Sequence, residues 1–170
     1  MLACSLIAGW FAQKATRLRL PMMALAAVAV LSGASFTYNT LHQSGIQVPA
    51  TITVDGKPYN LREGRVFLFF FDPQCSHCEE AAEHMSTYKW KSDVTVIALP
   101  TQQPQWAAGF LHDTKFKAHV SNDTAELRKL FVFTSPPYGV SVERGRVKGI
   151  VSHYDAPQPE AELRGFGLIE

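Results

Sequence analysis

The run of residues 66–71 constrains this chain more than any other segment. It reads Val-Phe-Leu-Phe-Phe-Phe and is bounded by Gly64 and Pro73. Because every position is apolar, the segment has no face to offer to solvent, and this pattern is typical of a central strand buried on both sides. Such a strand needs an apolar layer above it and another below it. The run therefore predicts an α/β domain whose central sheet is covered on both faces.

The residues around that run alternate between predicted strands and predicted helices. A second apolar run at 94–99 predicts another buried strand. Between the two runs, residues 75 to about 90 predict a helix, because buried-type residues recur at helical spacing: Cys78, Ala81, Ala82 and Met85. Further strands are expected at 51–54, 117–120, 138–143 and 147–154, and further helices at 104 to about 111, 125–131 and near 160–164.

The order of these elements predicts the topology of the sheet. Right-handed crossovers through helices make the early strands parallel. Asp55-Gly56 and Arg144-Gly145 are expected to form the tight turns of two hairpins. The second hairpin adds an antiparallel edge, so we expect a mixed sheet flanked by helices.

The composition excludes several classes of protein. A chain of 170 residues holds one domain and an appendage. Its apolar share of 46% excludes wholesale disorder, and its net charge of +1 provides no basic field for nucleic acid. Three cysteines are too few for a disulfide-stapled scaffold.

The N-terminal segment has the composition of a membrane-targeting sequence. Residues 1–36 contain no Asp or Glu, and their charged side chains are all basic: Lys14, Arg17 and Arg19. Residues 20–36 form an uncharged run near the minimum length that spans a hydrocarbon core of about 30 Å. Basic residues before the run and none just after it predict an N-terminus in the cytoplasm and the rest of the chain outside.

We therefore expect a basic cytoplasmic segment at 1–19, a transmembrane signal anchor at 20–36, a linker at 37–49 and the α/β domain at 50–170. A signal peptide cleaved after Ser32-Gly33-Ala34 is one alternative, since small residues occupy the cleavage positions. A buried core helix is the other. Cys4, in a short apolar stretch, is interpreted as incidental.

The chemistry of the chain is concentrated in Cys75-Ser76-His77-Cys78, which follows the first buried strand and opens a helix. Unpaired backbone N–H groups and the helix dipole stabilise a thiolate at Cys75. Cys78, one turn further on, is more buried and can attack a mixed disulfide from within. His77 can donate a hydrogen bond or a positive charge to the Cys75 sulfur. The arrangement favours thiol–disulfide exchange over a zinc site, which needs about four ligands, and over a structural disulfide, whose small ring restrains little.

Residues 69–78 resemble the active-site strand, loop and helix start of thioredoxin-fold proteins. Residues 135–145 add a second likeness, because Ser135-Pro136-Pro137-Tyr138 resembles the place where a cis-proline precedes a strand and a glycine hairpin. The resemblance implies that Pro137 is this cis-proline, that it lies against the cysteine pair, and that it leaves the backbone beside it open to an extended substrate.

Residues 52–61 indicate which subgroup of thioredoxin-fold proteins the chain resembles. Their Asp55-Gly56-Lys57 and Leu61 resemble the N-terminal hairpin of TlpA-like and ResA-like redoxins. Those proteins carry an extra helix and strand, matched here by residues 103–120, and are tethered to the outer face of a bacterial membrane by one helix, matched by 20–36. The resemblance covers residues 46–170.

The chain departs from that family at three positions. Gln74 stands where thioredoxins usually have Trp, Phe69 stands at the place of the buried acid, and Ala81 replaces a glutamate that many TlpA-like proteins carry. The proton acceptor for Cys78 is therefore open between His77, Glu80 and water. The direction of electron flow is open as well.

Together, residues and resemblance lead us to expect a thiol–disulfide oxidoreductase in the bacterial inner membrane, with its catalytic domain on the periplasmic side. The catalytic residues would be Cys75, Cys78, His77 and Pro137, with no cofactor beyond the redox-active disulfide and no metal. Partners would be thiols and disulfides of exported proteins, together with a membrane or thioredoxin-type electron donor or acceptor, and no nucleic acid.

Two alternative functions stay open. One is a peroxide-reducing redoxin, which would need an arginine near Cys75. The other is a non-enzymatic binding or metal-carrier module.

The anchor leads to a fractionation experiment. The full chain should sediment with membranes and stay there after a high-salt wash, because an apolar helix rather than charge holds it. Release by salt would contradict an apolar anchor, and a mature form beginning near Ser35 would identify a cleaved signal peptide.

Overall fold

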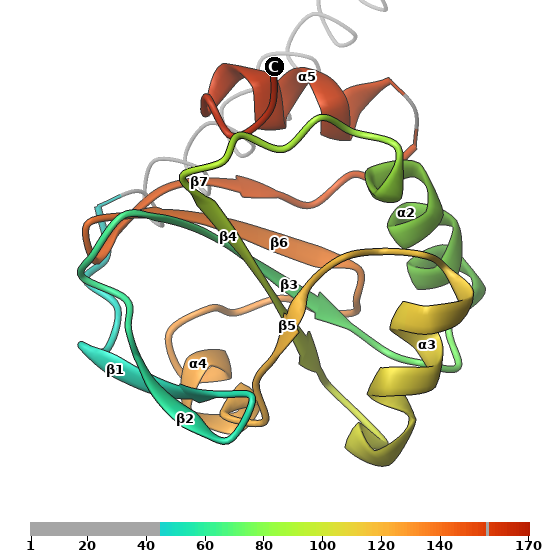
Figure 1. The fold of residues 1–170 in the computed structure, drawn as a ribbon, viewed down its shortest axis with the longest axis horizontal. Coiled ribbons are helices and arrows are strands. Elements are labelled where there is room, and N and C mark those ends of the chain that lie inside the picture. The colour runs from blue at the N-terminus through green and yellow to red at the C-terminus, as the bar shows by residue number, and fades with distance from the viewer. Residues whose placement is uncertain (1–44, 156) are drawn as a thin grey trace, which may run out of the picture. The chain divides into compact units, whose positions relative to one another are not determined.

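The apolar run predicted to be a central strand is β3 (Arg65–Phe71), and it lies in the middle of a five-stranded sheet (Figure 1). The strand order is β5-β4-β3-β6-β7. The other four strands are His119–Val120 (β5), Val94–Pro100 (β4), Tyr138–Glu143 (β6) and Arg146–Val151 (β7). The pairs β3–β4 and β4–β5 are parallel, and the pairs β3–β6 and β6–β7 are antiparallel. Parallel early strands and an antiparallel final hairpin are therefore confirmed.

This computed structural model describes residues 45–155 and 157–170, which belong to one compact unit, His42–Glu170. The segment predicted at 1–19, the anchor predicted at 20–36 and residues 37–44 of the predicted linker lie outside the described residues. Among the residues described, no helix has both the length and the apolar character needed to cross a bilayer.

The side chains of residues 66–71 are all fully buried and alternate between the two faces of the sheet. Phe67, Phe69 and Phe71 belong to one apolar cluster. Fully burying one such side chain contributes about 1.5–3 kcal/mol, so this strand is the largest single contributor to the core. The prediction of a strand buried on both sides is confirmed.

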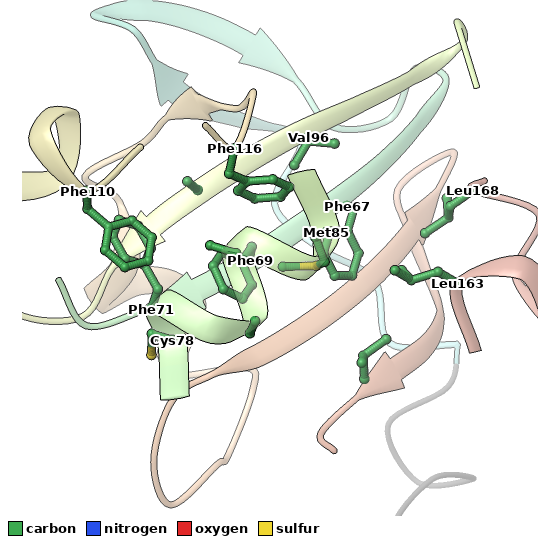
Figure 2. Packing of buried hydrophobic residues seen from close by; sticks show 14 of the residues in the cluster. Phe67, Phe69, Phe71, Cys78, Met85, Val96, Phe110, Phe116, Leu163 and Leu168 are labelled. Carbon is green, nitrogen blue, oxygen red and sulfur yellow. The ribbon is translucent and has the colours of Figure 1, made fainter. Parts of the chain in front are cut away.

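Helices cover the face that carries Phe67, Phe69 and Phe71. The helix α2 (Ser76–Ser86) follows β3 directly, α3 (Ala107–Asp113) extends the short 3-10 helix η1 (Pro104–Trp106), and α5 (Gln158–Gly165) closes the chain. Figure 2 shows Met85 of α2, Phe110 of α3 and Leu163 of α5 in this cluster with the phenylalanines of β3.

The opposite face has a thinner cover. A separate two-stranded hairpin, β1 (Thr51–Val54) and β2 (Lys57–Asn60), lies there with the short helix α4 (Thr124–Arg128). Ile52, Val54 and Leu127 from these elements are buried with Leu68 and Phe70 of β3. Both faces of the central sheet are thus covered, as the sequence predicts.

Both predicted hairpins have the expected tight turns. Asp55 and Gly56 have φ of 49° and 75°, and Arg144 and Gly145 have φ of 50° and 78°. Two consecutive residues with positive φ form the type I′ turn, whose twist matches that of the flanking strands.

The tip of the β1–β2 hairpin is attached to β5. The Asp55 N–H donates to the Val120 carbonyl at 2.8 Å, and the Asp55 carboxylate accepts from the Val120 N–H at 2.9 Å. The same carboxylate lies 2.6 Å from Nδ1 of His119. The Val120 and His119 contacts lower the pKa of Asp55. Because β5 is an edge strand, this attachment covers backbone groups that would otherwise be open to another chain.

Several boundaries differ from the sequence-based expectation. The helix α2 ends at Ser86 rather than near Trp90, because the hydroxyls of Ser86 and Thr87 donate to carbonyls three residues earlier, each at 2.7 Å, and so close the last turn. The helix expected at 125–131 is α4 (Thr124–Arg128); the side chain of its N-cap residue Asp123 makes no capping bond and instead accepts from the Thr53 N–H at 2.6 Å.

The folded unit also begins earlier than residue 50. Residues 45–48, placed in the linker from sequence, are attached to the edge strand β7: the Gly45 N–H donates to the Val147 carbonyl at 2.8 Å, and Val48 is buried. The sequence pattern did not indicate this attachment, because it depends on backbone groups of a strand about 100 residues away.

Gly139 of β6 offers a test of the packing. A methyl group at this position would overlap the hydroxyl of Tyr154 and the ring of Phe67. We expect Gly139→Ala to lower the free energy of unfolding by about 1–3 kcal/mol, the usual cost of overpacking. Gly109 of α3 is the matched control, because a methyl there meets nothing within 4 Å. Gly109→Ala should raise the free energy of unfolding by about 0.5–1 kcal/mol. Urea denaturation of the full chain measures both, and equal effects would contradict this core.

Candidate active site

The two cysteines of the motif lie where β3 ends and α2 begins. Cys75 is the N-cap residue of α2, with extended backbone angles of φ −96° and ψ 117°. Its carbonyl accepts from the N–H groups of Cys78 at 3.0 Å and Glu79 at 3.1 Å, which forms the first helical turn. The prediction that the motif follows a buried strand and opens a helix is confirmed.

Asp72 holds the loop between β3 and the motif. Its side chain accepts from the Gln74 N–H at 3.0 Å, and its carbonyl accepts from the Cys75 N–H at 3.1 Å. The backbone N–H of Asp72 lies 3.4 Å from the sulfur of Cys78 and donates to it. Sequence reasoning did not assign this residue a role, although an Asp-Pro pair directly after a strand signals a turn.

The two thiols differ in exposure. Both are free, Cys75 is partly exposed, and Cys78 is fully buried among the aromatic side chains under α2 (Figure 2). Cys75 at the cap lies at the boundary with solvent, whereas a residue one turn further on points to the sheet. The pair is therefore asymmetric in the sense that the sequence predicts.

Burial raises the pKa of the Cys78 thiol well above its ordinary value. The hydrogen bond from the Asp72 N–H acts in the opposite direction, and the neighbouring thiol of Cys75 adds to the increase. At neutral pH Cys78 is therefore protonated.

Tyr154 adds to the apolar surroundings of Cys78. Its hydroxyl oxygen is buried and has no hydrogen-bond partner among the described residues. Burial raises the pKa of Tyr154 and a charge on Cys78 raises it further, so both groups are neutral at ordinary pH. Tyr154 was missed from the sequence, because it lies 76 positions beyond Cys78 and carries no motif.

The structure places His77 and Glu80 together on the solvent side of α2. The side chain of His77 is 76% exposed, and its Nδ1 lies 3.8 Å from a carboxylate oxygen of Glu80. Cys78, by contrast, is on the buried side of the helix with Ala81. The role of His77 beside the Cys75 sulfur and the proton acceptor for Cys78 remain predictions.

The peptide bond between Pro136 and Pro137 is cis, as expected. Tyr138, the first residue of β6, pairs with Phe70 near the end of β3. Pro137 and the loop that leads to Cys75 therefore lie at the same end of the sheet. The contact of Pro137 with a substrate stays a prediction.

Gln74 links the motif loop to the segment before η1. The amide of Gln103 donates to the side-chain oxygen of Gln74 at 2.6 Å. Gln103 has a positive φ of 46°, which turns the chain into the short helix. The residue that replaces the usual tryptophan thus contacts the predicted extra helical segment.

The chain was compared with known proteins. No family model matches it, and no curated protein matches it in sequence. Solved structures do match. One is a protein from Bacteroides thetaiotaomicron provisionally named a protein disulfide isomerase, with a TM-score of 0.61, 19% identity, and coverage of 73% of this chain and 87% of that one.

Two further matches differ in their named activities. A secreted Mycobacterium tuberculosis disulfide oxidoreductase, described as homologous to Escherichia coli DsbE, has a TM-score of 0.51 and 17% identity over 68% of this chain and 92% of that one. A peroxidoxin from Mycobacterium tuberculosis has a TM-score of 0.55 and 15% identity over 75% of this chain and 98% of that one. The structural neighbours include thioredoxin-fold thiol–disulfide oxidoreductases, and this chain has the thioredoxin-like α/β fold that the sequence predicts.

The difference in burial predicts a difference in alkylation. At pH 8, Cys75 should react with iodoacetamide at least about tenfold faster than Cys78, because each unit of pKa changes the thiolate fraction tenfold. The raised pKa of Cys78 also means that its rate keeps climbing with pH beyond the range in which an ordinary thiol, with a pKa of about 8.5, has levelled off. Peptide mass mapping separates the two sites from Cys4. In denaturant the difference should vanish; its persistence there, or equal rates in the native chain, would be inconsistent with shielding by the fold.

Proposed function

We propose that this chain is a thiol–disulfide oxidoreductase that exchanges two electrons with cysteine pairs of other proteins. The observation that carries the proposal is the asymmetry of the motif: a partly exposed thiol at the N-terminus of α2 and a fully buried thiol one turn further on. A stepwise exchange needs one sulfur that meets the substrate and a second that is reached only from within.

In the reducing direction, the Cys75 thiolate attacks one sulfur of a substrate disulfide. A bond between Cys75 and the substrate forms, the substrate S–S bond breaks, and one substrate thiolate leaves. The sulfur of Cys78 loses its proton and attacks Cys75, which forms the Cys75–Cys78 disulfide and releases the second substrate thiolate. Two electrons have then passed to the substrate, whose thiolates take up two protons. The reverse sequence oxidises a dithiol substrate.

Asp72 supports the second step. Its N–H already points to the Cys78 sulfur at 3.4 Å, so it is placed to stabilise negative charge as Cys78 ionises. The side chain of Asp72 fixes the loop, which keeps that N–H in position.

Peroxide reduction is the second candidate, because a peroxidoxin shares the fold. Arginine is the residue expected to orient a peroxide, yet residues 66–88, which include the motif, contain no Lys or Arg. A peroxide-consumption assay distinguishes the two candidates.

The proposal includes an extracytoplasmic location. The absence of Asp and Glu from residues 1–36 and the uncharged run at 20–36 support it. One structural neighbour is described as secreted, which is consistent with that location.

A trapping experiment tests the roles of the two cysteines. In a Cys4→Ser background, Cys78→Ser should accumulate a mixed disulfide between Cys75 and a substrate protein, because the second attack is lost. Non-reducing gels and mass mapping measure the adduct. Cys75→Ser is the matched control and should trap little, since Cys78 is buried. Trapping through Cys78 alone would reverse the assignment, and trapping by neither variant would count against the exchange.

A further inference from the structure

A cavity of about 380 Å³ adjoins the motif between α2 and α3. Pro73 and Glu79 line it on the side of the motif, and Trp106, Phe110 and Asp113 line it on the other. The two helices lie side by side in Figure 1. The cavity therefore has apolar walls and two carboxylate-bearing residues.

Trp106 gives this cavity an unusual wall. The residue is 49% exposed, and it is one of two large hydrophobic residues exposed in the described part of the chain. A single exposed apolar residue means little by itself. Here Trp106 lines a hollow together with Phe110, a buried residue of the core, so an entering side chain would meet the ring of Trp106.

The two charged residues that line the cavity, Glu79 and Asp113, are both acidic. Residues 66–88 and 92–114, which include the whole lining, contain no Lys or Arg, although Lys115 directly follows the lining residue Thr114. These two ranges carry six acidic residues: Asp72, Glu79, Glu80, Glu83, Asp93 and Asp113. Asp93 pairs with Arg65. The imidazole of His77 lies near Glu80, and that of His112 lies 3.0 Å from Asp113. The two acidic lining residues, Glu79 and Asp113, thus favour a cation and disfavour an anion.

The cavity lies close to the reacting sulfur along the chain. Pro73 precedes Cys75 by two residues, and the N–H of Glu79 donates to the Cys75 carbonyl at 3.1 Å. A partner whose cysteine is joined to Cys75 would therefore hold the residues next to that cysteine beside the loop and helix turn that line this cavity.

We propose that the cavity accepts a lysine or arginine side chain that flanks the reacting cysteine of the partner protein. The cation would lie against the ring of Trp106 and near the carboxylates of Glu79 and Asp113. This inference rests on the proposed exchange activity and specifies its substrate class: cysteine pairs in basic sequence surroundings.

The test uses the full chain and disulfide-bonded peptides that differ in one residue beside the cysteine: Arg, Glu or norleucine. Stopped-flow measurements give the exchange rate constant for each peptide. At low ionic strength the Arg peptide should react about 5- to 10-fold faster than the Glu peptide, the size expected from one cation–π contact and exposed ion pairs. Because the charges are near the surface, the ratio should fall to about 2-fold at roughly 0.5 M salt.

Variants assign that ratio to the cavity. Trp106→Ala and the double variant Glu79→Gln/Asp113→Asn should each reduce the Arg-to-Glu ratio to about 2-fold or less, because the first removes the cation–π contact and the second removes the ion pairs. The ratio is taken on one variant at a time, so a change in the reactivity of Cys75 cancels. Glu83→Gln is the matched control: Glu83 is an exposed acid of α2 outside the cavity lining, and its variant should keep the ratio.

Three outcomes would overturn the proposal. An Arg-to-Glu rate ratio near one in the native chain would show that there is no selectivity. An equal loss of the ratio in Glu83→Gln would show that the selectivity comes from the overall negative charge of the surface and not from the cavity. A fastest reaction with the norleucine peptide assigns the cavity to apolar side chains. Exchange with bis(2-hydroxyethyl) disulfide, a small neutral probe, separates these outcomes from a failure of the proposed function, in which that probe does not react either.

Discussion

The burial of β3 on both faces is the constraint on which the rest of the structure depends. A strand with phenylalanine on one face and valine, leucine and phenylalanine on the other is stable only between two apolar layers. The helices α2, α3 and α5 provide one layer, and the β1–β2 hairpin with α4 provides the other. Because α2 follows β3 after a loop of four residues, packing α2 on the sheet also sets the position of the motif at its first turn.

The different environments of the two cysteines follow from that packing. The N-cap position leaves Cys75 at the end of the helix, whereas Cys78 takes its place on the face that α2 presses against Phe69 and Phe71. Burial then raises the pKa of Cys78, and the N–H of Asp72 is the polar group that the fold sets against its sulfur. The chemistry proposed for the pair thus depends on the same contacts that hold the helix to the sheet.

The extra segment between β4 and β5 contributes η1 and α3, whose residues line the cavity beside the motif. It holds α3 beside α2, joins the motif loop through the bond from Gln103 to Gln74, and presents Trp106 to solvent. Glu79 and Asp113 are the charged residues that line the cavity there, so under our proposal a partner joined to Cys75 meets an acidic, partly aromatic cavity beside the motif. The site that reacts with the partner and the site that selects it would then be neighbours on the surface.

The sequence by itself determined the order of the elements, the central strand, both tight turns and the place of the motif at a helix start, because these depend on local periodicity and on residues adjacent in the chain. It also indicated the cis bond before Pro137 through a family resemblance. Only the tertiary structure decided that residues 45–48 join β7, that the Asp72 N–H donates to the Cys78 sulfur, and that Tyr154 interacts electrostatically with Cys78. The cavity at Trp106 is also a feature that only the tertiary structure decided. Each of these depends on groups from segments separated in sequence or on backbone hydrogen bonds, and neither kind of contact leaves a periodic pattern in the sequence.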